Sequence, residues 1–110
     1  MARLVVVDCA RIADWDSLHD VFAEAFGFPA YYGRNSSAWI DCMTYLDGGD
    51  TAVKVYPGEV VTVHLEGAQT LKNRAPDLLA DIFEMSAFVN YRRTEMGEPP
   101  ILCLSAEICA

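Results

Sequence analysis

Three short apolar runs, far apart along the chain, constrain the fold more than any other feature of this sequence. They occupy residues 4–7, 60–65 and 101–104. The runs are apolar nearly throughout, and the first is almost continuously β-branched, a pattern typical of strands that are covered on both faces. Helical patterns separate them, and strands joined through helices pair in parallel. The sequence therefore predicts an α/β fold, a small three-stranded parallel sheet flanked by three to four helices.

The clearest helix is expected directly after the first strand. Asp14 or Asp16 can cap its N-terminus, and Gly27 suits the left-handed residue at its end. One stripe at the helical period is formed by Leu18, Val21, Phe22, Ala25 and Phe26. Pro29 prevents the helix from continuing.

A second helix is expected after a loop over residues 30–35. Gly33 can take a positive φ in this loop, and Asn35 or Ser36 can cap the helix, which extends to about residue 46. Its inward stripe is formed by Trp39, Cys42, Met43 and Leu46.

The second half of the chain is less sharply patterned. Residues 51–56 are ambiguous and could form a short extra strand before a turn at Pro57 and Gly58. One helical turn is expected over 69–74, and a longer helix from Pro76 towards Tyr91. The polar residues 92–98 are interpreted as a loop.

The charge and length of the chain argue against several classes of function. The 110 residues suit one domain spanning 1–110, and 16 acidic residues against 8 basic ones give a net charge of −8. Binding to nucleic acid or to an anionic membrane needs clustered cations, so neither is expected. Apolar runs are too short for a membrane span or a secretory signal, which predicts a cytoplasmic protein.

The acidic residues are unevenly distributed along the chain. Between residues 14 and 50 there are seven acids and one base, Arg34. This stretch is either a solvated surface or one that attracts a basic partner.

The cysteines do not indicate a metal centre or an enzyme. Their spacing contains no CxxC pair and no nearby histidine at metal-ligand spacing, so neither a metal nor a cofactor is expected. Because no export signal is recognised, reduced thiols are expected. The four are Cys9, Cys42, Cys103 and Cys109. A thiol enzyme would have to combine Cys42 with His19 or His64, but no hydrolase motif surrounds them. We expect structural roles for all three residues and no catalytic residues.

One segment carries a family resemblance. The string FPAYYGRN at residues 28–35 stands between Leu18-His19 and Asp41-Cys42. In this it resembles the barstar-like family of intracellular ribonuclease inhibitors. The matching block covers residues 12–44, and the remainder agrees in the order of its elements. This chain has extra residues around 48–59 and 90–100.

The resemblance implies a partner-binding protein whose loop and second helix block the active site of a small basic extracellular ribonuclease, barnase-like or a related microbial enzyme. Asp41 would take the place of the substrate phosphate, and Tyr31 would cover a catalytic histidine. The implied partner-binding residues are Tyr31, Tyr32, Gly33, Arg34, Asn35, Ser37, Ala38, Asp41, Tyr45 and Glu84. The protein would then serve as the immunity protein of a bacterial toxin–antitoxin pair.

The chain also departs from the family pattern. Ser37 stands where relatives usually carry an acid one helical turn before the key carboxylate, and Trp39-Ile40 replaces Leu-Trp. Arg34 places a positive charge at the rim of the expected interface. These differences favour an enzyme other than barnase as the partner. The alternative to a ribonuclease inhibitor is an acidic protein–protein interaction module whose basic partner is not a ribonuclease.

Overall fold

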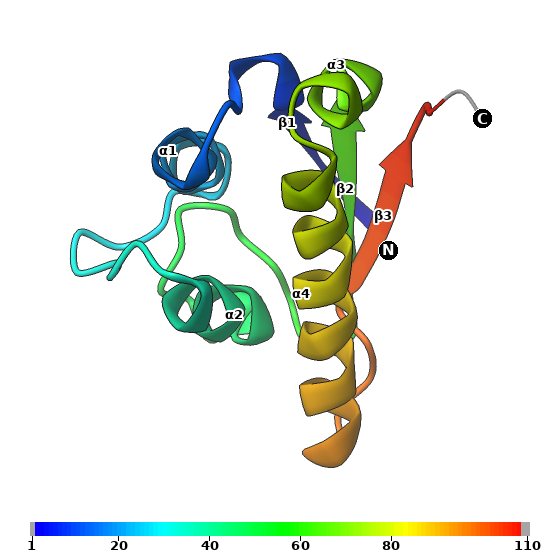
Figure 1. Ribbon diagram of the computed structural model, residues 1–110. Coiled ribbons are helices and arrows are strands. Elements are labelled where there is room, and N and C mark those ends of the chain that lie inside the picture. The colour runs from blue at the N-terminus through cyan, green and yellow to red at the C-terminus, as the bar shows by residue number, and fades with distance from the viewer. Residues whose placement is uncertain (1, 109–110) are drawn as a thin grey trace.

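The computed structural model describes residues 2–108. They form two layers, a three-stranded sheet and a layer of helices (Figure 1). The strands are β1 (Ala2–Asp8), β2 (Val60–Glu66) and β3 (Leu102–Ala106). The α-helices are α1 (Trp15–Phe26), α2 (Ser36–Thr44), α3 (Ala68–Arg74) and α4 (Pro76–Glu95). Two short 3₁₀ helices are η1 (Cys9–Arg11) and η2 (Leu46–Gly48).

The sheet confirms the predicted parallel pairing. Its order is β1-β2-β3, and both pairs are parallel. Val63 in the central strand aligns with Val5 on one side and Leu104 on the other. Each of the three apolar runs of the sequence therefore contributes one strand.

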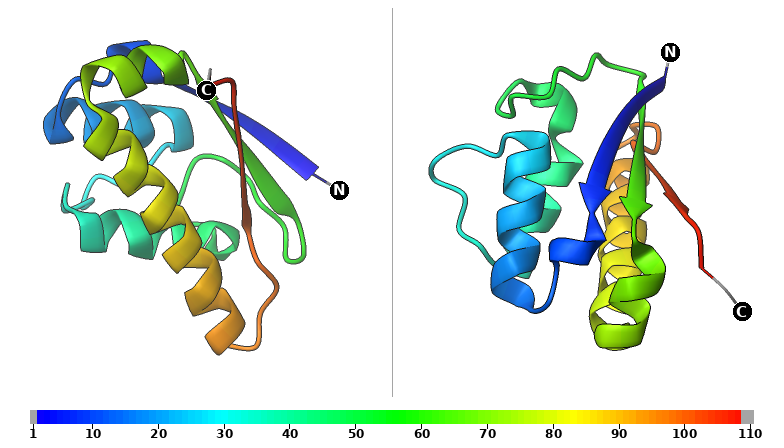
Figure 2. Two further views of the ribbon diagram at one scale, coloured as in Figure 1. Left: turned by 45° about the vertical axis from the view of Figure 1, so that its right-hand side comes forward. Right: turned by 90° about the horizontal axis from the view of Figure 1, so that it is seen from above.

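Coverage of the sheet differs from the prediction. The helices lie on one face (Figure 2), so side chains alternate along β1: Val5 and Val7 are buried, whereas Leu4 is 65% and Val6 49% exposed. The expectation of strands covered on both faces is therefore wrong. A continuous β-branched run raises strand propensity, but it does not report how many layers cover the sheet.

Helix α1 begins and ends as the sequence predicts. Asp14 caps it, and its carboxylate accepts a hydrogen bond from the Ser17 backbone N–H at 2.9 Å. The Ser17 hydroxyl in turn accepts from the Asp14 N–H at 3.0 Å, which completes a capping box. Gly27 ends the helix with φ +65°, and a Cβ at this position would overlap that of Ala52. Both its conformation and this close approach therefore require glycine.

Residues 51–56 form no strand; this segment is a loop attached to the end of α1. The backbone N–H of Ala52 donates to the Gly27 carbonyl at 2.9 Å, and that of Val53 donates to Phe26 at 3.2 Å. The predicted turn that follows is confirmed by a hydrogen bond from the Glu59 N–H to the Tyr56 carbonyl at 3.0 Å.

Helix α4 is one turn longer than predicted. It continues through residues that the sequence suggested were a loop and ends at Glu95. Asn90 fixes it to the sheet: its side-chain oxygen accepts from the backbone N–H groups of Ile101 and Leu102, both at 3.0 Å. The extra turn carries Arg93, which is 3% exposed. A buried arginine continues the inward stripe without adding hydrophobicity, so the periodicity did not reveal it.

The cysteines are free thiols in different surroundings. Cys9 is buried, Cys42 is half-buried and Cys103 is exposed on the open face of the sheet; Cys109 lies outside the described residues. Within residues 2–108, no group of three or more potential ligands is placed to hold a metal ion. In the same range we find no helix that is long and apolar enough to cross a membrane.

Candidate functional site

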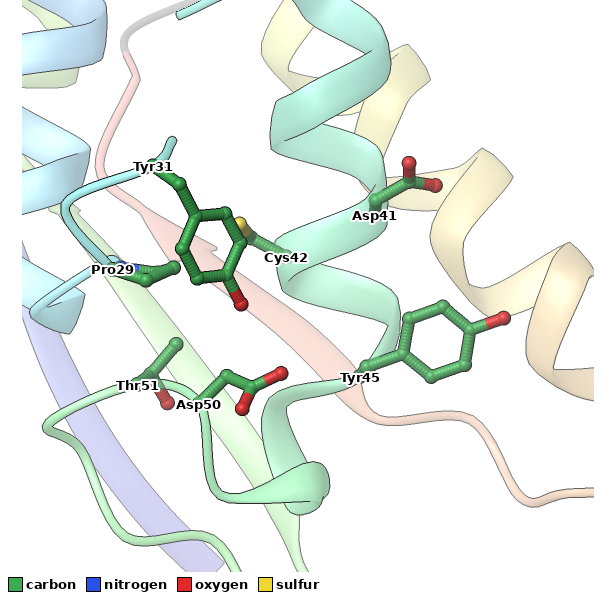
Figure 3. Close-up of a pocket in the computed structure, with 7 residues that line it drawn as sticks. All are labelled: Pro29, Tyr31, Asp41, Cys42, Tyr45, Asp50 and Thr51. Carbon is green, nitrogen blue, oxygen red and sulfur yellow. The ribbon is translucent and has the colours of Figure 1, made fainter. Parts of the chain in front are cut away.

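The loop over residues 28–35 and helix α2 form one surface, which we call the loop–helix face. It brings together most of the residues that the sequence singled out. Tyr31 stands over Cys42, and Asp41 extends from α2 towards α4 (Figure 3). Ser37 is exposed one helical turn before Asp41. Trp39, fully buried on the opposite side of α2, packs edge-on against Phe22 at 5.4 Å between ring centroids.

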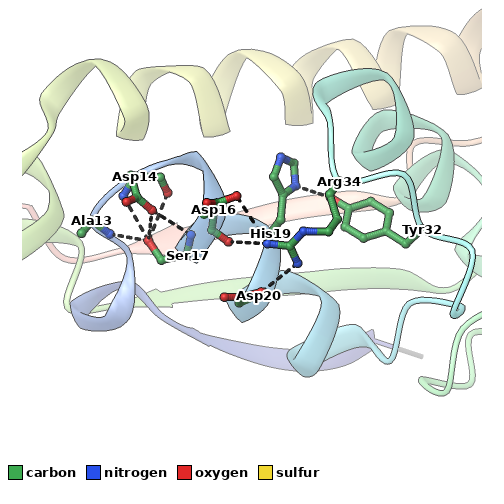
Figure 4. Close-up of polar contacts among 8 residues, drawn as sticks. All are labelled: Ala13, Asp14, Asp16, Ser17, His19, Asp20, Tyr32 and Arg34. Atoms are coloured by element: carbon green, nitrogen blue, oxygen red, sulfur yellow. Dashed lines mark hydrogen bonds and ion pairs between the residues drawn. The ribbon is translucent and has the colours of Figure 1, made fainter.

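The two neighbouring tyrosines of the loop point in different directions. Tyr31 is 76% exposed, whereas Tyr32 is half-buried and its hydroxyl hydrogen-bonds to Nδ1 of His19 (Figure 4). Burial lowers the pKa of His19, and the charge of Arg34 lowers it further; burial also raises the pKa of Tyr32. The neutral Tyr32–His19 pair therefore anchors the loop to α1, and only Tyr31 is presented outward.

Arg34 holds the other end of the loop. Its guanidinium donates to the Asp20 carboxylate at 2.7 Å and to the Asp16 backbone carbonyl at 3.1 Å (Figure 4). Its φ of +54° places it in the left-handed region, so the prediction that Gly33 takes this conformation is wrong. Residues other than glycine rarely adopt this conformation, and the two bonds to α1 hold Arg34 in it. The positive charge expected at the rim is thus largely balanced by the two aspartates.

Gly33 and Asn35 sit where the loop enters α2. A Cβ on Gly33 would meet only ordinary contacts, the nearest being Ala38 Cβ at 3.5 Å. These contacts therefore do not require glycine there, and Gly33 is exposed. Asn35 caps α2, because its side-chain oxygen accepts from the Ala38 N–H at 2.8 Å. Ala38 is half-buried beneath this turn.

Asp41, the central carboxylate, is held by a residue that the sequence analysis missed. Arg92 of α4 donates to Asp41 Oδ1 at 2.7 Å, and this bond raises the pKa of Arg92. The guanidinium also lies 5.9 Å from the centre of the Tyr45 ring, and the Tyr45 hydroxyl contacts Met96 Sδ at 3.8 Å. The Asp41 side chain nevertheless remains 62% exposed. It is oriented from one side and open to a partner on the other.

The adjacent arginine makes a buried ion pair. Arg93 donates to both carboxylate oxygens of Asp47, at 3.0 and 3.1 Å, and to the Thr44 carbonyl at 3.1 Å. Its Nε donates to the Pro99 carbonyl at 3.2 Å. These bonds fasten the end of α2 to α4 and to the chain that leads into β3.

A pocket of about 170 Å³ opens on the loop–helix face beside Tyr31 (Figure 3). It is lined by Pro29, Tyr31, Asp41, Cys42, Tyr45, Asp50 and Thr51. The charge of Asp50 raises the pKa of Tyr31, and burial adds to the shift. Figure 3 shows the Tyr31 hydroxyl pointing towards Asp50 at the rim of the pocket. The sequence analysis did not single out Asp50, because an acid in an unpatterned loop resembles any solvated surface residue.

Glu84 is the one predicted partner-binding residue that lies on α4. It is exposed on α4, about two turns before Arg92, and within residues 2–108 no ion pair joins it to α2. Its assignment to an outer salt bridge stays a prediction.

The thiol–histidine pairs weighed from the sequence do not form. His19 hydrogen-bonds to Tyr32, and Nδ1 of His64 lies 3.1 Å from the Ser105 hydroxyl. Burial raises the pKa of Cys42, and the charges of Asp41 and Asp50 raise it further. A nucleophilic thiol requires the opposite shift.

Comparison with known proteins identifies the class of protein that combines this fold with this face. The chain matches the family described as Barstar (barnase inhibitor) over residues 2–104, nearly its whole length, and it belongs to that family. Among curated proteins, the comparison found no match. The family consists of inhibitors that bind barnase-like ribonucleases, so the resemblance carried by residues 28–35 is confirmed.

Proposed function

We propose that this protein inhibits a small, basic, secreted ribonuclease by placing its loop–helix face in the active site of that enzyme. The observation that carries the proposal is the Asp41 carboxylate, 62% exposed on a helix whose opposite side is fixed in the core. Membership of the barstar family supports the choice of a ribonuclease as the partner.

Asp41 has the chemistry to replace a phosphate. A ribonuclease holds its phosphodiester with lysine, arginine and histidine side chains, and these can donate charge-assisted hydrogen bonds to a carboxylate instead. A carboxylate offers no bond for the enzyme to cleave. Because α2 and Arg92 already orient Asp41, little conformational freedom is lost on binding.

Tyr31 and Gly33 complete the contact in this proposal. The exposed Tyr31 ring covers a catalytic histidine of the enzyme, and it can do so without moving because the neighbouring Tyr32 anchors the loop. Gly33 lets the enzyme approach the backbone closely, which explains a glycine at a position where the fold itself does not need one.

The net charge of −8 suits a basic partner, since opposite charges accelerate association. The inhibitor would act inside the cell that makes the enzyme, as an immunity protein that neutralises any ribonuclease retained there.

The test is an inhibition titration against a panel of small bacterial ribonucleases, with RNA cleavage as the readout and binding measured in parallel. We expect stoichiometric loss of activity for at least one basic enzyme of the panel. Binding to a basic ribonuclease that leaves cleavage intact would contradict active-site inhibition and favour an acidic interaction module.

A further inference from the structure

We propose that the pocket beside Tyr31 receives the side chain of a lysine or arginine from the rim of the inhibited ribonuclease's active site. This inference rests on the proposed function and deepens it, because it names a second contact of the same face. Asp41 also lines this pocket, but its carboxylate is directed towards α4, so the inference concerns the carboxylate of Asp50 (Figure 3).

The lining of the pocket suits a long cationic side chain. Pro29, the ring of Tyr31 and the half-buried Cys42 supply apolar walls, and Asp50 places a carboxylate at the edge. Lysine and arginine combine an apolar stem with a charged end, so the stem can lie against these walls while the head meets the carboxylate. The face of the Tyr31 ring adds attraction for a cation.

Asp50 differs from the other acids around the face in its lack of a counter-charge. Asp20, Asp41 and Asp47 each form an ion pair with an arginine of the same chain. Within residues 2–108, Asp50 has no such partner, and its side chain is exposed. Its charge is therefore available to a cation that arrives with the partner.

The segment that carries Asp50 is fixed before binding. Thr51 is buried, and its hydroxyl donates to the Val53 carbonyl at 3.1 Å. The backbone bond from Ala52 to Gly27 attaches the same segment to α1 at 2.9 Å. A carboxylate on a fixed segment loses less conformational freedom when it binds than one on a flexible loop.

The position of Asp50 makes the pocket a determinant of specificity. Asp50 lies outside both the loop over residues 28–35 and helix α2, so it adds a contact to those made by Tyr31 and Asp41. Enzymes that share the phosphate site but differ at the rim would be distinguished here. The inhibitor would favour those whose rim cation reaches the pocket.

The first experiment compares variants against a ribonuclease that the parent protein inhibits. Asp50→Asn keeps the shape and removes the charge, and Glu66→Gln, at the far end of β2, is the matched control. We expect Asp50→Asn to weaken inhibition between about tenfold and a hundredfold through faster dissociation, and the control to match the parent. Unchanged inhibition by Asp50→Asn would overturn the inference.

Asp41→Ala in the same series separates the two proposals. If Asp41→Ala loses inhibition while Asp50→Asn retains it, only the pocket assignment fails. If both variants inhibit like the parent, the pocket assignment fails together with the proposed role of Asp41.

A second experiment tests the pocket without any ribonuclease. Cys42 lines the pocket, so its modification rate by a cationic reagent, 2-aminoethyl methanethiosulfonate, is compared with that by neutral methyl methanethiosulfonate. Peptide mass spectrometry resolves each thiol, and exposed Cys103 serves as the internal reference. We expect the cationic-to-neutral ratio at Cys42 to fall at least about threefold in Asp50→Asn, because the local potential concentrates cations. A ratio that Asp50→Asn leaves unchanged would contradict a cation subsite.

Discussion

Arg92 and Arg93 are consecutive residues of α4, and each binds an aspartate near the end of α2, but the two pairs differ in burial. The Arg93 and Asp47 side chains are 3% and 18% exposed, and two parallel hydrogen bonds join them. The corresponding values for Arg92 and Asp41 are 29% and 62%, with one bond. The same chemistry therefore occurs once inside the fold and once on its surface.

The difference explains how one helix can serve both structure and recognition. In the Arg93–Asp47 pair, each partner satisfies a charge that would be costly to leave buried alone. In the Arg92–Asp41 pair, solvent already stabilises both charges, so the bond sets orientation more than stability. A partner can therefore recruit Asp41 without disturbing the fold.

The comparison predicts a large difference between matched substitutions. Arg93→Met should lower the free energy of unfolding by about 3–5 kcal/mol, because it leaves Asp47 unpaired beside the buried end of α2. Arg92→Met should lower it by less than about 1 kcal/mol. Urea unfolding of both variants measures the two values. Equal losses would mean that burial does not separate the two pairs.

Salt should slow association with the ribonuclease, because it screens exposed charges. Raising the ionic strength to about 0.5 M shortens the Debye length to a few ångströms, and we expect association with the inhibited ribonuclease to slow about tenfold. Dissociation should change less, because contacts formed within the interface are screened less than charges in solvent. Stopped-flow association rates across a salt series provide the measurement, and a flat series would argue against electrostatic steering.

Adding charge beside Asp41 should have the smallest effect. Ser37 is exposed one turn before Asp41, so Ser37→Asp should tighten binding to a barnase-like ribonuclease by about two- to fivefold. Thr70→Asp on α3 adds the same charge away from the loop–helix face and controls for net charge. If Ser37→Asp binds no better than Thr70→Asp, that side of α2 does not face the enzyme.

The sequence predicts where helices and strands begin and end better than it predicts what covers them. Asp14, Gly27 and Asn35 are recognisable because capping and positive φ restrict the residue types that a chain can use there. The one-sided coverage of the sheet was not predictable from the apolar run in β1, since Leu4 and Val6 are as hydrophobic as the buried valines beside them.

Only some residues of the candidate site could be predicted from the sequence. The loop–helix face could be located because residues 28–35 and Asp41 are close together in the chain and match a family pattern. Arg92 could not, because it meets the face only through tertiary packing of α4 against α2. Asp50 is close to Asp41 in sequence, but no pattern distinguishes it from any other loop acid. No local pattern marks an arginine in the last turn of a helix as the partner of a carboxylate 51 residues earlier.

The most direct test of the central claim is Asp41→Ala, measured by inhibition of the ribonuclease and by unfolding of the free protein. Removing a carboxylate that the enzyme's cations bind should weaken inhibition by about 2–5 kcal/mol, or roughly 30-fold to several-thousand-fold. The free energy of unfolding should change by less than about 1 kcal/mol, since the Arg92–Asp41 pair is exposed. Tyr31→Ala should weaken inhibition less, because it removes packing and no charge. If Asp41→Ala inhibits as well as the parent protein, Asp41 does not replace the substrate phosphate.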